Sequence, residues 1–208
     1  MITEVKDFKR KEIFENFNKC SNPFITLTTK IDVTKVVEHC KKTKKFYATF
    51  GYIVTKTVNQ IDNFKYRCKD NKIYYCDEIR SNYTQRYTES DTIGFYDVPI
   101  QNNLKKYIYE YKKIENEFFL GNKNLSDKKM DKIWLSCQPW FKFESFFPIF
   151  DKKCSIPQFI WDRYENVGGK YYMNLMISVH HGFIDGFHIA KFIELLNRNI
   201  EDVIDNVN

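Results

Sequence analysis

The chain has 208 residues, 43% of them hydrophobic and 17% aromatic, so it is long and apolar enough to bury one sizeable core. Its net charge of +6 reflects 33 basic against 27 acidic residues, and no nucleic-acid-binding motif accompanies the basic cluster at 41–45, which disfavours a nucleic-acid partner. No long apolar run, no leader and no metal-ligand spacing among the six cysteines is present, so we expect a cytoplasmic protein with no metal and no membrane contact.

In the first third of the chain, the residue pattern predicts three helices and one strand. Aromatic residues recur at helical spacing over residues 9–17, and a β-branched run over residues 24–31 predicts a strand. Asp32 is the expected N-cap of a helix that continues to about residue 42. Apolar positions at helical spacing predict a further helix over residues 46–62.

The rest of the chain alternates short strand-like runs with two helical patterns. Asp70-Asn71 is a hairpin-turn signal, and residues 121–129 form a polar loop. Helices are expected over residues 102–118 and 186–198. Strands are expected over residues 65–69, 72–76, 82–88, 92–96, 132–137, 155–164 and 170–180. This order predicts a single α+β domain spanning residues 1–208, with helices packed on one face of a mixed or antiparallel β-sheet.

The most informative motif is the run His-His-Gly-Phe-Ile-Asp-Gly at residues 180–186, directly after a predicted strand. It holds two of the chain's four histidines. Histidine titrates near neutrality and is the side chain best suited to move protons there. Two histidines at a strand end could instead be hydrogen-bonded edge residues, but the Asp-Gly pair and the predicted helix behind it favour a functional site. The chain contains no glycine-rich nucleotide-binding loop.

Three further stretches accompany this motif. They are Phe-Lys-Arg-Lys-Glu-Ile-Phe-Glu at 8–15, Leu-Thr-Thr-Lys-Ile-Asp-Val-Thr at 27–34 and Leu-Ser-Cys-Gln-Pro-Trp-Phe-Lys-Phe-Glu-Ser-Phe at 135–146. Together with residues 178–192, they resemble the chloramphenicol acetyltransferase family in order and spacing over nearly the whole chain. The resemblance implies a CoA-dependent acyltransferase-like two-layer sandwich that transfers acetyl from acetyl-CoA to a hydroxyl of chloramphenicol, which inactivates the antibiotic without a metal. It also implies a homotrimer with active sites at subunit interfaces.

The resemblance implies catalytic roles for two residues. His181 matches the base that removes a proton from the attacking hydroxyl, which is otherwise a poor nucleophile. Ser136 matches the residue that stabilises the oxyanion formed when the thioester is attacked. Asp185 matches a structural carboxylate that pairs with the arginine at position 10, and we expect this pair to be buried and bidentate. We expect His180 to be structural, and Gly186 to allow a sharp turn into the last helix.

The resemblance also implies substrate contacts. Trp140 and, more weakly, Tyr164 match residues that pack along CoA, although either could be a core aromatic. Phe17, Tyr107 and Phe146 match aromatic residues that line the acceptor site. Ile160 is a further substrate-binding candidate.

Several positions depart from the family pattern. Phe17 replaces a tyrosine whose hydroxyl helps to hold the drug, and Ile160 replaces a threonine that acts through water. Trp134 replaces an asparagine, and the loop over residues 121–129 is longer than usual. These departures leave the acetyl-transfer residues intact, and they predict weakened affinity for chloramphenicol.

Other functions remain open at this stage. The same fold could acetylate another hydroxylated acceptor, or the protein could be a non-catalytic trimeric relative that binds the drug or CoA. The acyltransferase core of 2-oxo acid dehydrogenase complexes shares His-x-x-x-Asp-Gly but follows a lipoyl domain and linkers. Condensation domains carry the His-His motif in the middle of a chain about twice as long. The joint presence of Arg10, Ser136, His181 and Asp185 favours a catalytic acetyltransferase.

Overall fold

The computed structural model describes residues 1–87, 90–121, 123–149, 151 and 153–206. Its strands are β1 (Ile2–Glu4), β2 (Phe24–Asp32), β3 (Tyr66–Lys69), β4 (Lys72–Cys76), β5 (Arg80–Arg86), β6 (Ile93–Val98), β7 (Lys132–Gln138), β8 (Gln158–Asp162), β9 (Glu165–Val167) and β10 (Lys170–His180). Its helices are α1 (Lys11–Asn18), α2 (Thr34–Thr43), α3 (Phe46–Asn59), the 3-10 helix η1 (Asp62–Lys65), α4 (Leu104–Gly121) and α5 (Gly186–Asp205).

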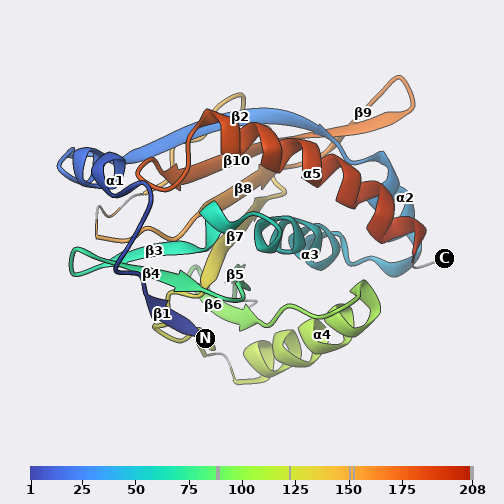
Figure 1. The fold of residues 1–208 in the computed structure, drawn as a ribbon. Helices are drawn as coiled ribbons and strands as arrows, with labels where there is room; N and C mark the ends of the chain where they lie inside the picture. Colours follow the sequence, from blue (N-terminus) through green and yellow to red (C-terminus); the bar gives the residue numbers. More distant parts are fainter. Residues whose placement is uncertain (88–89, 122, 150, 152, 207–208) are drawn as a thin grey trace.

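The strands form two sheets. The larger sheet has the order β2-β10-β8-β7-β5-β6, with β9 paired to the start of β10, and the smaller sheet has the order β1-β4-β3 (Figure 1). β7 is parallel to β5 and β8, whereas β10 is antiparallel to β2 and β8, so the larger sheet is mixed, as expected. The antiparallel pairing sends the end of β10, where the His-His motif begins, away from the carboxyl ends of β7 and β8.

Helices α2 to α5 cover one face of the larger sheet (Figure 1). α2 packs against β10, α3 against β5 and β7, and α4 against β6, while α5 lies on α2 and α3. The central helix α3 is buried over most of its length, as its apolar composition requires. A Cβ at Gly51 would lie 2.1 Å from the hydroxyl of Tyr83, so only glycine permits this close approach of helix and strand. The expected α+β architecture, with helices on one face, is confirmed.

Most expected elements are present with small shifts at their ends. β4 and β10 have the expected bounds, and the turn between β3 and β4 has positive φ at both Asp70 and Asn71, as a two-residue hairpin requires. The helix expected to reach residue 62 ends at Asn59, because a 3-10 turn follows it. The expected end of β5 at Thr88 lies outside the described residues.

Two differences have chemical causes. β8 begins only at Gln158, whereas a strand from residue 155 is expected, because Pro157 has no N–H to add to the sheet. α2 begins at Thr34 with Val33 in the N-cap position, so the expected cap at Asp32 lies one residue too early. Asp32 still serves that end, since its Oδ1 accepts hydrogen bonds from the backbone N–H of Thr34 at 3.0 Å and from its hydroxyl at 2.6 Å.

The sheet face opposite the helices carries Ser136 and Ile160, two of the candidate site residues. Paired residues on neighbouring strands project their side chains to the same side. Ser136 pairs with Ile160, Ile160 with Met176, and Met176 with Thr28, so these four side chains form one row across β7, β8, β10 and β2. We call this side the open face. Leu135 projects to the other side, into the core beneath the helices.

Candidate active site

His181 follows the last residue of β10 and is held by two hydrogen bonds. Its backbone N–H donates to the carbonyl of Pro23 at 2.8 Å, which ties it to the segment before β2. Its ring Nδ1 lies 3.1 Å from the carbonyl oxygen of Ile184. Because a carbonyl oxygen only accepts, Nδ1 carries the hydrogen in the neutral ring, and Nε2 then has the lone pair. This tautomer presents Nε2 as a proton acceptor, which is what a general base needs.

One face of the His181 ring is covered by Phe17, from α1. The two ring centroids lie 3.9 Å apart and the planes are inclined by 27°. Helix α1 can come this close because residue 182 is glycine, where a Cβ would lie 2.9 Å from the Cα of Phe14. The glycine after the two histidines is therefore needed for this packing, and Phe17, a candidate acceptor-site residue, lies beside the candidate base.

His180 lies in the core and has a structural environment. It is 1% exposed and packs against the rings of Phe14, Phe24 and Phe183. The backbone N–H of Gly182 donates to its Nδ1 at 3.2 Å. Burial, and secondarily the nearby His181, lowers the pKa of His180 to about 4, so the ring is neutral at pH 7. These contacts agree with the structural role expected for His180.

The expected ion pair between Arg10 and Asp185 is present. Nη1 of Arg10 donates to Oδ2 of Asp185 at 3.0 Å. The pair is neither buried nor bidentate, contrary to expectation, because the two side chains are 23% and 32% exposed and a single nitrogen makes the contact. Burial alone would raise the pKa of Asp185, but hydrogen bonds from Arg10 and His188 outweigh it and lower the pKa below its ordinary value.

Asp185 also begins α5. Its Oδ1 accepts from the backbone N–H groups of Phe187 and His188, and its own backbone N–H donates to the ring Nδ1 of His188 at 3.3 Å, which closes a capping box. The same Nδ1 lies 2.7 Å from Oδ1 of Asp185. His188 was not among the candidates from the sequence, although its place three residues after the N-cap is the signal for such a box. Since Nδ1 of His181 bonds to Ile184 instead, Asp185 does not orient the base.

Ser136 lies half-buried on β7 and projects onto the open face. The side-chain amide Nε2 of Gln138 donates to its Oγ at 3.3 Å. A hydroxyl has two lone pairs and one hydrogen, so the hydrogen of Ser136 stays available for another acceptor. Gln138 was not among the candidates from the sequence, although its spacing of two residues along a strand places it on the same face as Ser136.

Ser136 and His181 lie far apart within one chain. Ser136 is linked through Ile160 to Met176, and His181 comes five residues after Met176. Two strand spacings of about 4.8 Å and five residues of about 3.3 Å each place their Cα atoms about 19 Å apart. A base and an oxyanion donor must each lie about 3 Å from the reacting atoms. One chain alone therefore does not bring the two groups into a single site.

Trp140 and Tyr164 lie on adjoining segments beyond the ends of β7 and β8. The backbone N–H of Arg163 donates to the carbonyl of Phe141 at 3.3 Å, which joins the two segments. The side chain of Trp140 is 64% exposed and that of Tyr164 is 39% exposed. The alternative to CoA binding was that Trp140 and Tyr164 are buried core aromatics, and neither residue is buried.

Phe17 is one of four residues expected at the acceptor site. The other three lie in two different places. Ile160 lies next to Ser136 in the open-face row, and Phe146 packs against its apolar cluster. Tyr107 is completely buried on the helix-covered side, where its hydroxyl donates to Ser81 at 2.6 Å. The structure therefore does not bring Tyr107 to the open face, and its hydroxyl is used in core packing.

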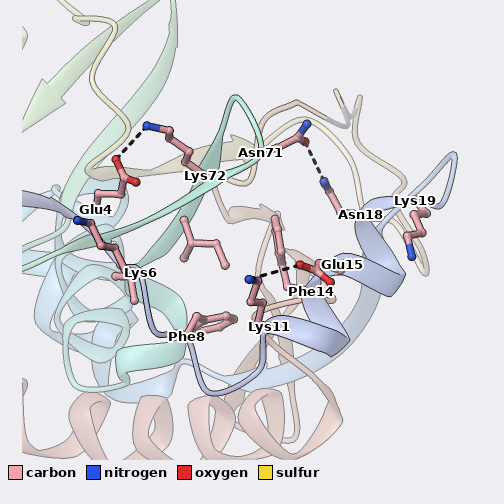
Figure 2. Close-up of a pocket in the computed structure, with 12 residues that line it drawn as sticks. Glu4, Lys6, Phe8, Lys11, Phe14, Glu15, Asn18, Lys19, Asn71 and Lys72 are labelled. Carbon is pink, nitrogen blue, oxygen red and sulfur yellow. Dashed lines mark hydrogen bonds and ion pairs between the residues drawn. The ribbon is translucent and has the colours of Figure 1, made fainter.

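A groove of about 690 Å³ lies between α1 and the β3–β4 hairpin (Figure 2). Neither His181 nor Ser136 lines it. Two of its lysines are paired with carboxylates, Lys72 with Glu4 at 3.2 Å and Lys11 with Glu15 at 3.9 Å. Within the described part of the chain, no three His, Cys, Asp or Glu side chains gather as possible metal ligands. None of the helices in those residues is long and apolar enough to cross a membrane.

The mixed sheet and the environment of the His-His-x-x-x-Asp-Gly motif define an acyltransferase. The chain belongs to the chloramphenicol acetyltransferase family, whose model matches residues 1–197. It is 26% identical over 210 residues to chloramphenicol acetyltransferase 3 of Escherichia coli, with 93% of each chain covered. The expected family is confirmed.

Two solved structures show how widely the fold is shared. A chloramphenicol acetyltransferase matches with a TM-score of 0.82 at 22% identity, over 96% of this chain and 100% of the other. A truncated catalytic core of the 2-oxoacid dehydrogenase multienzyme complex from Thermoplasma acidophilum matches with a TM-score of 0.68 at 18% identity, over 95% and 97% of the two chains. At these identities the likeness shows the fold alone.

Proposed function

We propose that this protein transfers an acetyl group from acetyl-CoA to a hydroxyl of chloramphenicol and so inactivates the antibiotic. Family membership over residues 1–197 supports the reaction class and the substrates. The observation that carries the proposal within the site is the bond of His181 Nδ1 to Ile184, which leaves Nε2 as a proton acceptor at the end of β10. Such a base is what a hydroxyl acceptor requires.

The chemistry needs one base and one oxyanion donor. His181 Nε2 takes the proton of the acceptor hydroxyl while the hydroxyl oxygen bonds to the thioester carbonyl carbon. Negative charge then develops on the carbonyl oxygen, and the hydroxyl of Ser136 donates a hydrogen bond to it. When the carbon–sulfur bond breaks, His181 returns the proton to the CoA sulfur, so the products are an acetyl ester and free CoA thiol.

The site is assembled from two copies of the chain, in a homotrimer. The separation of about 19 Å between His181 and Ser136 within one chain supports this arrangement. A second observation is the apolar surface beyond β7, where Trp140, Phe147 and Ile149 are 64%, 66% and 92% exposed. Exposed apolar side chains gathered on one segment favour an interface. Each copy would then contribute His181 to one site and Ser136 to another.

Acetyl-CoA would lie beyond the ends of β7 and β8. Its adenine and pantetheine parts can pack on exposed aromatic rings, and its phosphates attract cations. Trp140 and Tyr164 offer such rings. The ring centroids of Tyr164 and Tyr171 lie 5.7 Å apart. Nζ of Lys41 lies 5.4 Å from the centre of the Tyr171 ring, which places a cation near Tyr164. The group transferred is the acetyl of this co-substrate, and no residue is assigned to a metal.

A different hydroxylated acceptor is the second candidate, and two residues favour it. Phe17, which stacks on His181, has no hydroxyl to hold the drug. Ile160 is 9% exposed in an apolar cluster with Phe143 and Met176 and cannot position a water. The surroundings of the base and of the oxyanion donor are therefore apolar, so an acceptor with fewer polar groups than chloramphenicol would lose less on binding.

One assay separates these possibilities. Purified protein is mixed with acetyl-CoA and chloramphenicol, and the release of free thiol is followed alongside acetylated drug by mass spectrometry. Equal amounts of thiol and acetyl-chloramphenicol are expected. If thiol appears only with other hydroxylated compounds, the acceptor is wrong. If no compound gives turnover although calorimetry detects CoA or drug binding, the protein is the non-catalytic relative.

A further inference from the structure

We propose that Gln138 is a positioning residue that aims the hydroxyl hydrogen of Ser136 at the developing oxyanion. The proposal rests on the proposed acetyl transfer. Gln138 is the last residue of β7, two positions after Ser136, so both side chains project onto the open face. Its Nε2 lies 3.3 Å from the Oγ of Ser136. Both residues are half-buried, and water competes less for their hydrogen bond than on a fully exposed surface.

The direction of this hydrogen bond gives it its effect. An amide nitrogen has no lone pair to offer, so Gln138 donates and Ser136 accepts. The Ser136 hydroxyl then cannot point its single hydrogen toward Gln138 and keeps it for another acceptor on the open face. A free serine hydroxyl would rotate among three staggered positions and would have to be ordered during the reaction. Preorganised donors avoid that reorganisation, which is the source of their catalytic effect.

The end of β7 is held firmly enough to fix this geometry. Gln138 pairs with Asp162 on β8. The carboxylate of Asp162 is buried and accepts from the backbone N–H of Asn174 at 2.8 Å, from the Asn174 amide at 2.9 Å and from the backbone N–H of Phe143 at 3.2 Å. These bonds tie the segment after Gln138 to β8 and β10. The glutamine therefore projects from a rigid strand end toward Ser136.

A double-mutant cycle tests the inference. Gln138→Met keeps the length of the side chain but removes the donor. We expect it to lower kcat about two- to tenfold, the usual effect of one neutral hydrogen bond, with both KM values unchanged. In a Ser136→Ala background the same change is expected to have no further effect, because the hydroxyl that it positions is gone. Gln138→Glu should be worse than Gln138→Met, since a carboxylate only accepts and would draw the Ser136 hydrogen toward itself.

Gln85→Met, on β5 of the same sheet, is the matched control and should leave kcat unchanged. An unchanged kcat in Gln138→Met overturns the inference. An equal loss in the wild-type and Ser136→Ala backgrounds also overturns it, because a merely structural residue would act additively. Failure of the proposed function has a different signature, which is a wild-type protein that does not turn over chloramphenicol. The cycle is then measured on the slow hydrolysis of acetyl-CoA by water, which forms the same oxyanion.

Discussion

The ring of Phe17 lies against the ring of His181, with centroids 3.9 Å apart. This contact joins α1 to the end of β10 and places an apolar side chain beside the candidate base. A hydroxyl added to the Phe17 ring would therefore lie near His181.

Phe17→Tyr is therefore expected to tighten chloramphenicol binding. One regained neutral hydrogen bond is worth about 0.5 to 1.5 kcal/mol, so the KM for the drug should fall about two- to tenfold. The KM for acetyl-CoA should not change, because the added hydroxyl lies on α1 and not among the Trp140 and Tyr164 rings proposed to bind CoA. Steady-state kinetics with each substrate varied in turn measures both. An unchanged drug KM would mean that the acceptor is held by other groups.

His181→Ala is expected to remove nearly all turnover while the fold and CoA binding persist. The imidazole Nε2 is the proposed proton acceptor, and general base catalysis contributes about a hundred- to ten-thousandfold. Initial rates measure turnover, circular dichroism checks the fold, and calorimetry measures CoA binding. The neighbouring His180→Asn protein is the control, and a folded His180→Asn protein without activity would assign the base to the wrong histidine.

Ser136→Ala is expected to lower kcat about a hundredfold or more with little change in either KM, because the hydrogen bond forms mainly in the transition state. A loss confined to the KM for the acceptor would make Ser136 a binding residue. The measurement needs only saturation curves for both substrates at one pH.

The sequence predicted the fold better than it predicted the site. Long elements such as β10 follow from a β-branched and aromatic run, whereas β1 and β9 have only three residues each and carry no pattern. The pairing of Arg10 with Asp185 was implied by the resemblance to the family and is present in the structure, while its partial exposure depends on how α1 meets α5. Helical periodicity alone could not reveal that Tyr107 faces the core.

Individual side-chain contacts within the site could not be predicted from the sequence. Gln138 reaches Ser136, and His188 reaches Asp185, only because both pairs share a face of one regular element. The spacing permits such contacts without requiring them. The separation of His181 from Ser136 follows from strand order, which brings residues distant in sequence to opposite ends of the sheet.

Acid should destabilise the protein through His180. Its pKa is about 4 in the folded protein and 6.5 ordinarily, so the unfolded chain binds more protons between these values. Stability from this group is complete above pH 6.5 and is lost as the pH falls to 4, by about 3 kcal/mol. Denaturant unfolding at fixed protein concentration measures it. His180→Asn, which keeps an acceptor for Gly182, should lack this slope, and a wild-type slope in that variant would point to other groups.

Two inactive variants should restore each other's activity if the site joins two copies. His181→Ala and Ser136→Ala chains carry different tags, are co-expressed and are purified through both tags. In a mixed trimer, a site works only where the intact His181 of one copy meets the intact Ser136 of its neighbour, which leaves one working site in each mixed trimer, about a third of the sites. We therefore expect activity far above that of either variant alone. The double variant, mixed with wild type, is the control, because each intact site then needs two wild-type chains. Mixed trimers as inactive as their parents would place both residues in one chain's own site and would contradict the separation of about 19 Å derived from the sheet register.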